Sequence, residues 1–252
     1  GLVMRADSDF QAADAAANPD AAGIFLNYIA HADISFGGGL VTVNGNTSRY
    51  NSIHLVTSRP TVTHNTVRFG ADAAMSANPD SFDDSGGRIG PELYGNTLFN
   101  NTFNGIFVRI GTSAGSPLER LNKTARFDDT DIVHLITENL EIAGNPGGPL
   151  NGTPRPSGRL AVDPGVVVKL GSSRIEGIRG SSHLIAEGTP GNPVIMTSIN
   201  DDRYGAGGTF DTTNNGTSVA AAAGNWGGLM FHADSRLSTD SAYLAFAGGN
   251  MP

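Results

Sequence analysis

The sequence contains no cysteine, and this absence excludes several classes of chemistry. A disulfide framework, a thiolate nucleophile and a cysteine-bound metal each need a cysteine side chain. No apolar run approaches the roughly 18 residues that a membrane-spanning helix needs. The opening residues, GLVMRADSDF, also lack the charged start and apolar core of a signal peptide. We therefore expect no membrane insertion and no thiolate chemistry.

Basic residues are few as well. The chain has 16 Lys and Arg against 24 Asp and Glu, which gives a formal net charge of -8 at pH 7 and a pI near 5.1. Proteins that bind nucleic acid cluster Lys and Arg on one surface to contact phosphates. The basic residues here are scattered along the chain, so we expect no nucleic-acid partner.

Turn-forming residues are abundant. The 252 residues include 34 Gly and 13 Pro, and counting along the sequence gives 21 Asn and 18 Asp, while only 38% are hydrophobic. Such a chain can fold if each buried face is narrow, and all-β chains of this length often form one unit. We predict a single domain over residues 1–252. Because AYLAFAGGNMP stops just after a strand-like run, we also expect a fragment or repeat unit of a larger protein.

The chain is divided into short strand-like runs. Two Ala-rich stretches, at 11–20 and 71–80, are the best candidates for short helices or ordered loops, and Pro19 and Pro79 would end a helix there. Strands are predicted over 28–36, 52–57, 61–69, 103–110, 132–142, 159–170, 182–187, 193–198, 227–231 and 241–246.

The spacing of similar segments indicates a repeat. Leu135, Leu160 and Leu184 open comparable segments at nearly equal intervals along the chain. Asn-Thr-apolar triplets recur too, beginning at Asn65, Asn96 and Asn101. A strand-and-turn repeat of roughly 20 to 30 residues without helices is typical of a solenoid. The pattern predicts a parallel β-helix, in which each strand pairs with its equivalent one coil away.

The stretch LIAEGTPGNPVIMTS, residues 184–198, fits one corner of such a coil. Leu184 and Ile185 would belong to one strand and Val194 to Met196 to the next, with Gly188 to Asn192 turning the chain. Gly serves where φ is positive, and Pro fixes φ at a corner that needs no N–H. Asp163-Pro164-Gly165 would make the same bend one coil earlier.

Residues 159–231 carry a more specific pattern: PGVVVKL, then LIAEGT followed by NPVIMTS, an acidic Gly-rich excursion, and NWGGLMF. This pattern resembles right-handed parallel β-helix regions of large secreted or surface-attached bacterial proteins. The Asn-rich segment at 95–110 resembles coils of pectate-lyase-like folds. The resemblance implies an all-β, right-handed parallel β-helix in an extracellular or cell-surface setting, and it transfers no catalytic residues. Projecting loops are expected near 71–92, 111–128, 145–157 and 199–225.

The acidic excursion at 199–216 is a candidate calcium loop, because oxygen ligands between Gly turns suit Ca²⁺. DTTNNG resembles the start of an acidic calcium loop, although Thr213 stands at the third ligand position and Ala222 at the twelfth. The alternative is a solvated loop without metal. The candidate ligands are Asp201, Asp202, Asp211 and Asn215.

A second acidic cluster, RFDDTDIVH at 126–134, could pair carboxylates for glycoside hydrolysis. Parallel β-helix enzymes that cut pectin carry Asp clusters, but Asn-Thr-Asp, Gly-His-Gly and Arg-Ile-Lys motifs do not occur here. We therefore expect Asp128 and Asp129 to cap a turn before the strand at 132, and we name no catalytic residue.

The remaining candidates favour structural roles. Trp226 could stack on a sugar, but an aromatic at a strand entrance more often covers the edge of a core. The six histidines lie in separate coils, so they are predicted to face outward or to be hydrogen bonded. They are His31, His54, His64, His134, His183 and His232.

These observations favour a structural module of a large extracellular or cell-surface protein, joined to neighbouring modules or to other copies by end-to-end association into fibres. A cofactor is not expected, calcium apart. Two alternatives stay open. A polysaccharide-cleaving enzyme needs carboxylates and a basic residue in one groove, and a glycan-binding adhesin needs exposed aromatics along one face, whereas most Phe and Tyr here fall at positions predicted to be internal.

Overall fold

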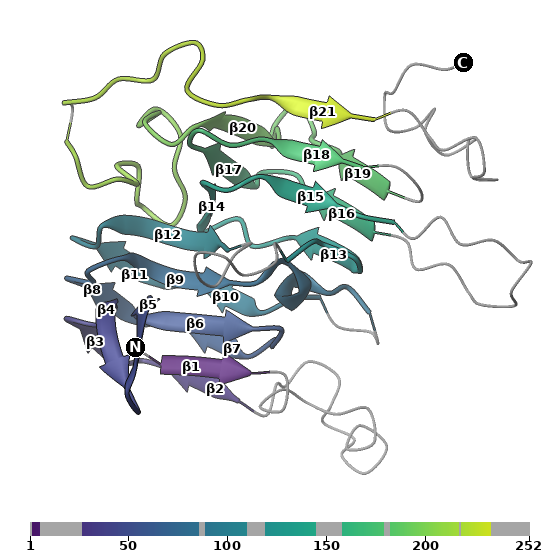
Figure 1. Cartoon of the computed structure of the whole chain (residues 1–252). Helices are drawn as coiled ribbons and strands as arrows, with labels where there is room; N and C mark the ends of the chain where they lie inside the picture. Colours follow the sequence, from purple (N-terminus) through teal and green to yellow (C-terminus); the bar gives the residue numbers. More distant parts are fainter. Residues whose placement is uncertain are drawn as a thin grey trace, which may run out of the picture.

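The computed structural model describes residues 2–5, 27–85, 89–109, 119–144, 158–178, 182–216 and 218–232. These residues form a parallel β-helix whose coils stack from β1 to β21 (Figure 1). Within these ranges no helix has the length and apolar character needed to cross a membrane. Several predicted segments lie outside the described residues: the strand at 241–246, the Ala-rich stretch at 11–20, the loop at 145–157 and the first part of the loop at 111–128.

The longest sheet, sheet A, runs the length of the stack, and all its neighbouring strands are parallel. Its order is β1 (Leu2–Arg5), β6 (Ile53–Val56), β9 (Ala73–Ala77), β12 (Phe103–Val108), β14 (Val133–Ile136), β17 (Val167–Leu170) and β20 (Ile195–Ser198).

Shorter parallel sheets form the other sides of the coils. The first coils use sheet B, with β2 (Tyr28–Ala30), β7 (Thr61–Thr63) and β10 (Glu92–Tyr94), and sheet C, with β3 (Asp33–Ser35), β8 (Thr66–Arg68) and β11 (Thr97–Phe99). The later coils use sheet E, with β13 (Thr124–Phe127), β16 (Gly158–Val162) and β19 (Ser182–Ala186), and sheet F, with β15 (Leu140–Ile142), β18 (Ile175–Gly177) and β21 (Leu229–Phe231).

Side chains that point into the coils stack in rows and form one continuous core, as predicted. Along sheet A, Ile53 lies under Met75, and His134 lies under Val168. The partners in the second pair are farther apart in the sequence than those in the first. The coils therefore differ in length, because corners and excursions are added without breaking the stack.

The leucine repeat is confirmed for Leu160 and Leu184 and is wrong for Leu135 and Leu160. Leu160 pairs with Leu184 in sheet E, one coil later, as the repeat predicts. Leu135 instead lies in sheet A opposite Lys169 and packs in a separate apolar cluster. The step from Leu135 to Leu160 therefore joins two different sides of the coil.

Two of the three Asn-Thr-apolar triplets stack as predicted. Thr66 lies opposite Thr97, and Val67 lies opposite Leu98. The third triplet, at Asn101, belongs to the next corner, where its Oδ1 accepts the N–H of Gly70.

The corner before the stacked triplets has the same backbone conformation in three successive coils. Its left-handed residues have φ of 55° at His31, 55° at His64 and 66° at Gly95. Each directly follows a strand of sheet B, so the three residues lie at equivalent positions in the stack.

The Ala-rich stretch at 71–80 is a strand, not a helix or a projecting loop. Ala73–Ala77 forms β9 in the middle of sheet A, and all five residues are buried. Asn78 is extended, as expected for a residue before proline, and a short 3-10 helix, η3 (Pro79–Phe82), follows. Small side chains fit here because both faces of sheet A are covered at this level.

A β-hairpin interrupts the first coils. β4 (Gly39–Val43) and β5 (Asn46–Tyr50) pair antiparallel and form sheet D. Asn44 and Gly45 have φ of 51° and 79°, which suits the tight turn that Asn-Gly favours.

The excursion at 199–216, which is the first part of the loop predicted to project at 199–225, does not project from the coils, whereas residues 218–224 of that loop are exposed. It lies back on the outer face of sheet A and reaches sheet C (Figure 1, yellow-green). The N–H of Asn104 in β12 donates to the carbonyl of Thr212, and the Oγ1 of Thr209 donates to the carbonyl of Leu98 in β11. Ile199 and Ala206 pack there on outward apolar side chains of sheet A. This burial fixes the excursion against the sheet.

Candidate functional site

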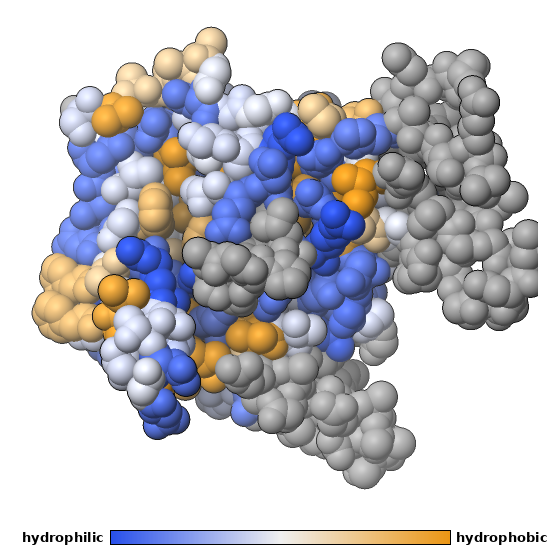
Figure 2. All heavy atoms as spheres, viewed as in Figure 1, coloured by the Kyte–Doolittle hydropathy of each residue, from blue (hydrophilic) through white to orange (hydrophobic). Residues whose placement is uncertain are grey.

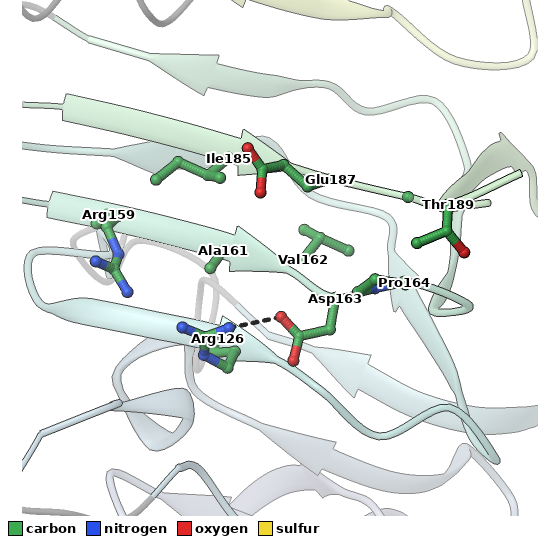
Figure 3. Close-up of a pocket in the computed structure, with 10 residues that line it drawn as sticks. Arg126, Arg159, Ala161, Val162, Asp163, Pro164, Ile185, Glu187 and Thr189 are labelled. Carbon is green, nitrogen blue, oxygen red and sulfur yellow. Dashed lines mark hydrogen bonds and ion pairs between the residues drawn. The ribbon is translucent and has the colours of Figure 1, made fainter. Parts of the chain in front are cut away.

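A groove on the outer face of sheet E is the strongest candidate site within the described residues (Figure 3). Its volume is about 480 Å³. Arg126 comes from β13, Arg159 from β16, and Glu187 directly follows β19. Strand alternation places these side chains outside, while their neighbours Phe127 and Leu160 point into the core.

Ion pairs fix the two guanidinium groups of the groove. Arg126 donates to Asp163 at 2.6 Å and to Asp84 at 3.1 Å. Arg159 also donates to Asp84, at 3.1 Å. Glu187 faces the same space from the next coil. The groove therefore presents paired charges beside the apolar surface of Ile185.

The corner at 184–198 forms one wall of this groove, so it is both a bend and part of a candidate site. Gly188 and Thr189 line the groove, and β19 and β20 run on either side as predicted. Gly165, at the equivalent corner one coil earlier, has φ of 89°. Gly188 is required for another reason: a Cβ there would lie 2.7 Å from the backbone nitrogen of Val194.

The acidic cluster at 128–131 lies next to the groove, and its carboxylates face two different surroundings. Asp128 is close enough to Arg126 and Asp163 for their charges to act on it, whereas Asp129 and Asp131 turn toward sheet B. Asp129 accepts the N–H of Leu93 at 3.0 Å, and Asp131 accepts the N–H of Gly95. Asp129 and Asp131 therefore cap the edge of β10, so the predicted cap on a turn before β14 is wrong for Asp129.

Burial changes the protonation of this cluster. Loss of solvation, reinforced by the negative charge of Glu92, raises the pKa of Asp128 to about 6. Loss of solvation and the charge of Asp128 raise the pKa of Asp129 to about 9. One Oδ atom of Asp129 is buried without a hydrogen-bond partner among the described residues. Asp129 is therefore protonated at neutral pH.

The calcium candidates lie around basic side chains. Asp201 accepts from Arg203 at 2.8 and 2.9 Å and from Thr197 at 2.6 Å, and the pKa of Asp201 is lowered mainly by the hydrogen bonds from Arg203. The ammonium of Lys169 donates to the carbonyl of Phe210 at 2.8 Å and to the Oγ1 of Thr212 at 2.5 Å.

The other candidate ligands also have defined places. Asp211 accepts the N–H groups of Asn215 and Gly216, which closes a local turn. Asp202 is near enough to Asp211 and Lys169 for their charges to act on its carboxyl. Among the described residues no group of three acidic or His side chains has a geometry that could hold a metal ion. Calcium binding here stays a prediction.

His134 does not face outward, which is one of the two states predicted for the histidines. It is completely buried in the core, and its ring stacks on Phe127 at 4.4 Å and lies 5.7 Å from Phe82. Burial lowers the pKa of His134 to about 3. Trp226 packs against the core edge, as predicted.

Most Phe and Tyr side chains were predicted to be internal, but several lie on the surface. Phe36 and Phe69 are 80% and 39% exposed, and their rings stack at 5.2 Å. Phe69 contacts Phe99 edge-on at 6.2 Å, and Arg68 lies over both rings. This patch appears at the left of Figure 2, beside sheet C. Phe36 has Phe69 on one side of its ring and keeps most of its surface exposed.

The end of the coil stack at β19, β20 and β21 is the second candidate site. Each of these strands has a described partner on one side only. An apolar hollow of about 670 Å³ lies there, lined in part by Pro193, Val194 and Met196. The stack therefore ends in an open edge within the described residues.

A scan of the chain against protein-family models gave no match, and searches of curated proteins and of solved structures gave none either. Function is therefore inferred from the geometry of this chain.

Proposed function

We propose that this chain is a structural module of a large extracellular or cell-surface protein, a β-helical rod that continues by stacking further coils. The observation that carries the proposal is the change in burial at the last described coil. Leu160 and Val168 are fully buried, whereas Leu184 and Met196, which lie directly above them, are partly exposed.

The driving force for continuation has two parts. A further coil would bury the inward side chains of the open end, at about 25 cal/mol per Å² of apolar surface. It would also pair the outer edges of β19, β20 and β21, and unpaired edges template the addition of strands. The partner is a parallel coil of the same kind, from a neighbouring module or from a second copy. The extracellular setting rests on the resemblance of residues 159–231.

Sedimentation velocity over a wide concentration range tests the proposal. We expect concentration-dependent formation of elongated species, which electron microscopy would show as rods. Met196→Lys places a charge at the open end and should weaken association. Val219→Lys introduces the same charge at another exposed apolar residue and should leave association unchanged. A monomer at every concentration would contradict end-to-end association.

The groove on sheet E favours glycan binding as a second function. Guanidinium and carboxylate groups beside aliphatic surface can bind the hydroxyls and the ring carbons of a sugar. Affinity electrophoresis through neutral and acidic polysaccharides tests this function, with Arg159→Gln as the variant and Arg120→Gln, a surface ion-pair residue elsewhere, as the control. Retardation that survives Arg159→Gln would exclude this groove. New reducing ends during incubation would indicate the enzyme alternative.

A further inference from the structure

The guanidinium groups of the sheet E groove are neutralised by the chain itself. Arg126 donates to Asp84 and Asp163, and Arg159 donates to Asp84 at 3.1 Å. Two guanidinium groups therefore face two carboxylates. Neither guanidinium is left as an unmatched cation that would select an acidic ligand.

Glu187 is the charged residue of the groove that has no such partner. It lines the groove directly after β19, and it is exposed (Figure 3). Within the described part of the chain its carboxylate takes part in no hydrogen bond or ion pair. Adding Glu187 to the matched pairs gives three carboxylates against two guanidinium groups. A concave surface with one unmatched carboxylate attracts a cation.

The surface next to Glu187 is aliphatic. Ile185 is 39% exposed and lies opposite Ala161 of β16, and Pro164 lines the same space. The groove volume of about 480 Å³ falls in the range of sites for organic ligands, roughly 300–1,000 Å³. These features suit a cationic group carried on a carbon skeleton better than a bare ion.

The groove crosses several coils, and its acidic edge repeats with them. Asp128, Asp163 and Glu187 directly follow β13, β16 and β19, and the last residues of these strands lie in register. These positions therefore recur once per coil, at the strand spacing of about 5 Å. One sugar unit in an extended glycan has a similar length. A linear glycan lying along the stack would therefore place about one unit at each coil.

We propose that this groove binds a glycan whose sugars carry free amino groups, and that Glu187 sets the preference for the amine. The inference rests on the proposed glycan-binding function of the groove and names its ligand class. One sugar ammonium donates to the Glu187 carboxylate in a charge-assisted hydrogen bond. Ile185 packs against the carbons of the sugar ring. Acetylation of the amine removes this hydrogen bond, and an acidic sugar is repelled by Glu187.

Isothermal titration of the full chain with three oligosaccharides of equal length tests the ligand class. The probes are the tetramer of glucosamine, the tetramer of N-acetylglucosamine and the tetramer of galacturonic acid, at about pH 6, which keeps the sugar amines protonated. We expect the glucosamine tetramer to bind about tenfold more tightly than the N-acetylglucosamine tetramer, as one charged hydrogen bond predicts. The galacturonic acid tetramer should bind most weakly.

A matched pair of variants separates this site from general attraction, because a chain with a net charge of -8 attracts any cationic oligomer. Glu187→Gln should weaken binding of the glucosamine tetramer about tenfold and leave the N-acetylglucosamine tetramer unaffected. Asp33→Asn removes the same charge at an exposed ion pair on sheet C and should leave both unaffected. Circular dichroism confirms that each variant is folded.

The possible failures of this experiment are distinct. If folded Glu187→Gln binds the glucosamine tetramer as tightly as the natural chain does, the role of Glu187 is overturned. If the neutral or the acidic tetramer binds at least as tightly and Arg159→Gln weakens that binding, the groove binds glycans but the preference for amino sugars is wrong. If none of the three tetramers binds, both the preference and the glycan-binding function are wrong.

Discussion

Asn65 and Asn96 occupy the same position in neighbouring coils, and the backbone N–H of Asn65 donates to the Oδ1 of Asn96 at 3.1 Å. The Nδ2 of Asn96 donates to the carbonyl of Val62 at 2.6 Å. One coil earlier, the Oδ1 of Asn65 accepts the N–H of Ala32 at 2.9 Å. Side-chain amides therefore provide the hydrogen bonds between coils at a corner where strand pairing is interrupted.

Because of these hydrogen bonds, we predict that Asn96→Ala strongly lowers the stability of the folded chain. The substitution leaves the buried N–H of Asn65 and the carbonyl of Val62 without their partner, which should lower the free energy of unfolding by about 1–3 kcal/mol. Asn46→Ala, on the exposed hairpin, should change it by less than about 0.5 kcal/mol. Urea denaturation followed by circular dichroism measures both. Equal effects would mean that the corner amides add nothing to stability.

Because the pKa of Asp129 is raised in the folded state, we predict that the free energy of unfolding falls as the pH rises. Its folded pKa is about 9, well above its ordinary value near 4, so the folded state holds a proton that the unfolded state releases. The contribution of protonated Asp129 to the free energy of unfolding is complete below about pH 4 and is lost progressively toward pH 9. Asp129→Asn mimics the protonated group and should be more stable than the natural chain at about pH 8, by about 1 kcal/mol or more.

Denaturant midpoints of both proteins at several pH values check this. At about pH 4 the two should differ little. A natural chain whose stability does not decrease between pH 5 and pH 8 relative to Asp129→Asn would show that this carboxyl is ionised in the fold.

For His134 we predict the opposite trend: its effect on the free energy of unfolding becomes unfavourable as the pH falls. Its folded pKa is about 3 against an ordinary value near 6.5, so between these values the unfolded state binds a proton that the buried ring does not. Its contribution therefore falls as the pH drops below about 6.5. His134→Leu should remove this loss and reduce the drop in stability between pH 7 and pH 4 by about 3 kcal/mol.

Thermal and urea unfolding at both pH values measure the effect of His134→Leu. The same acid-induced drop in the natural chain and in His134→Leu would show that the buried ring is not the source of the pH dependence.

We predict that Lys169 holds the excursion at 199–216 in place against sheet A. Its ammonium holds the backbone of Phe210 and the hydroxyl of Thr212, and burial lowers its pKa. Lys169→Met removes both hydrogen bonds and should raise amide exchange across 199–216 by about tenfold. Exchange in sheet A near β9 should stay slow. Uniform acceleration along the chain would indicate global destabilisation instead.

Calcium at the same excursion is tested by thermal unfolding. If Asp202 and Asp211 bind Ca²⁺, millimolar calcium should raise the melting temperature, a chelator should reverse the rise, and Asp211→Asn should abolish it. Because Lys169 and Arg203 already supply positive charge to the neighbouring carboxylates, we expect a rise smaller than that of a dedicated calcium loop. No calcium-dependent shift would remove this site from consideration.

Local signals in the sequence predicted much of the fold. Strands with turn residues and no helix-forming period indicated the solenoid, and the corner at 184–198 was located because Gly and Pro have restricted backbone roles. The hairpin at 39–50 was missed although Asn44-Gly45 signals its turn. β9 was missed because its alanines carry no alternation, and their strand conformation comes from burial on both faces of sheet A.

The candidate sites were less accessible from sequence. Arg126 and Asp163 are 37 residues apart, and only the stacking of β13 on β16 brings them into one groove. Similarly, Asp163 and Glu187 line the same groove because β16 and β19 pair in register. Spacing along the chain carries no information about such pairs, because the length of a coil varies from one level of the stack to the next.

The sequence by itself determined that this chain forms short strands joined by tight corners, because turn geometry and alternation act between near neighbours. Only the tertiary structure decided which side chains lie above one another, that the excursion at 199–216 folds back onto sheet A, and that His134 is buried. Those outcomes depend on how coils of unequal length stack, and stacking is a property of the whole core.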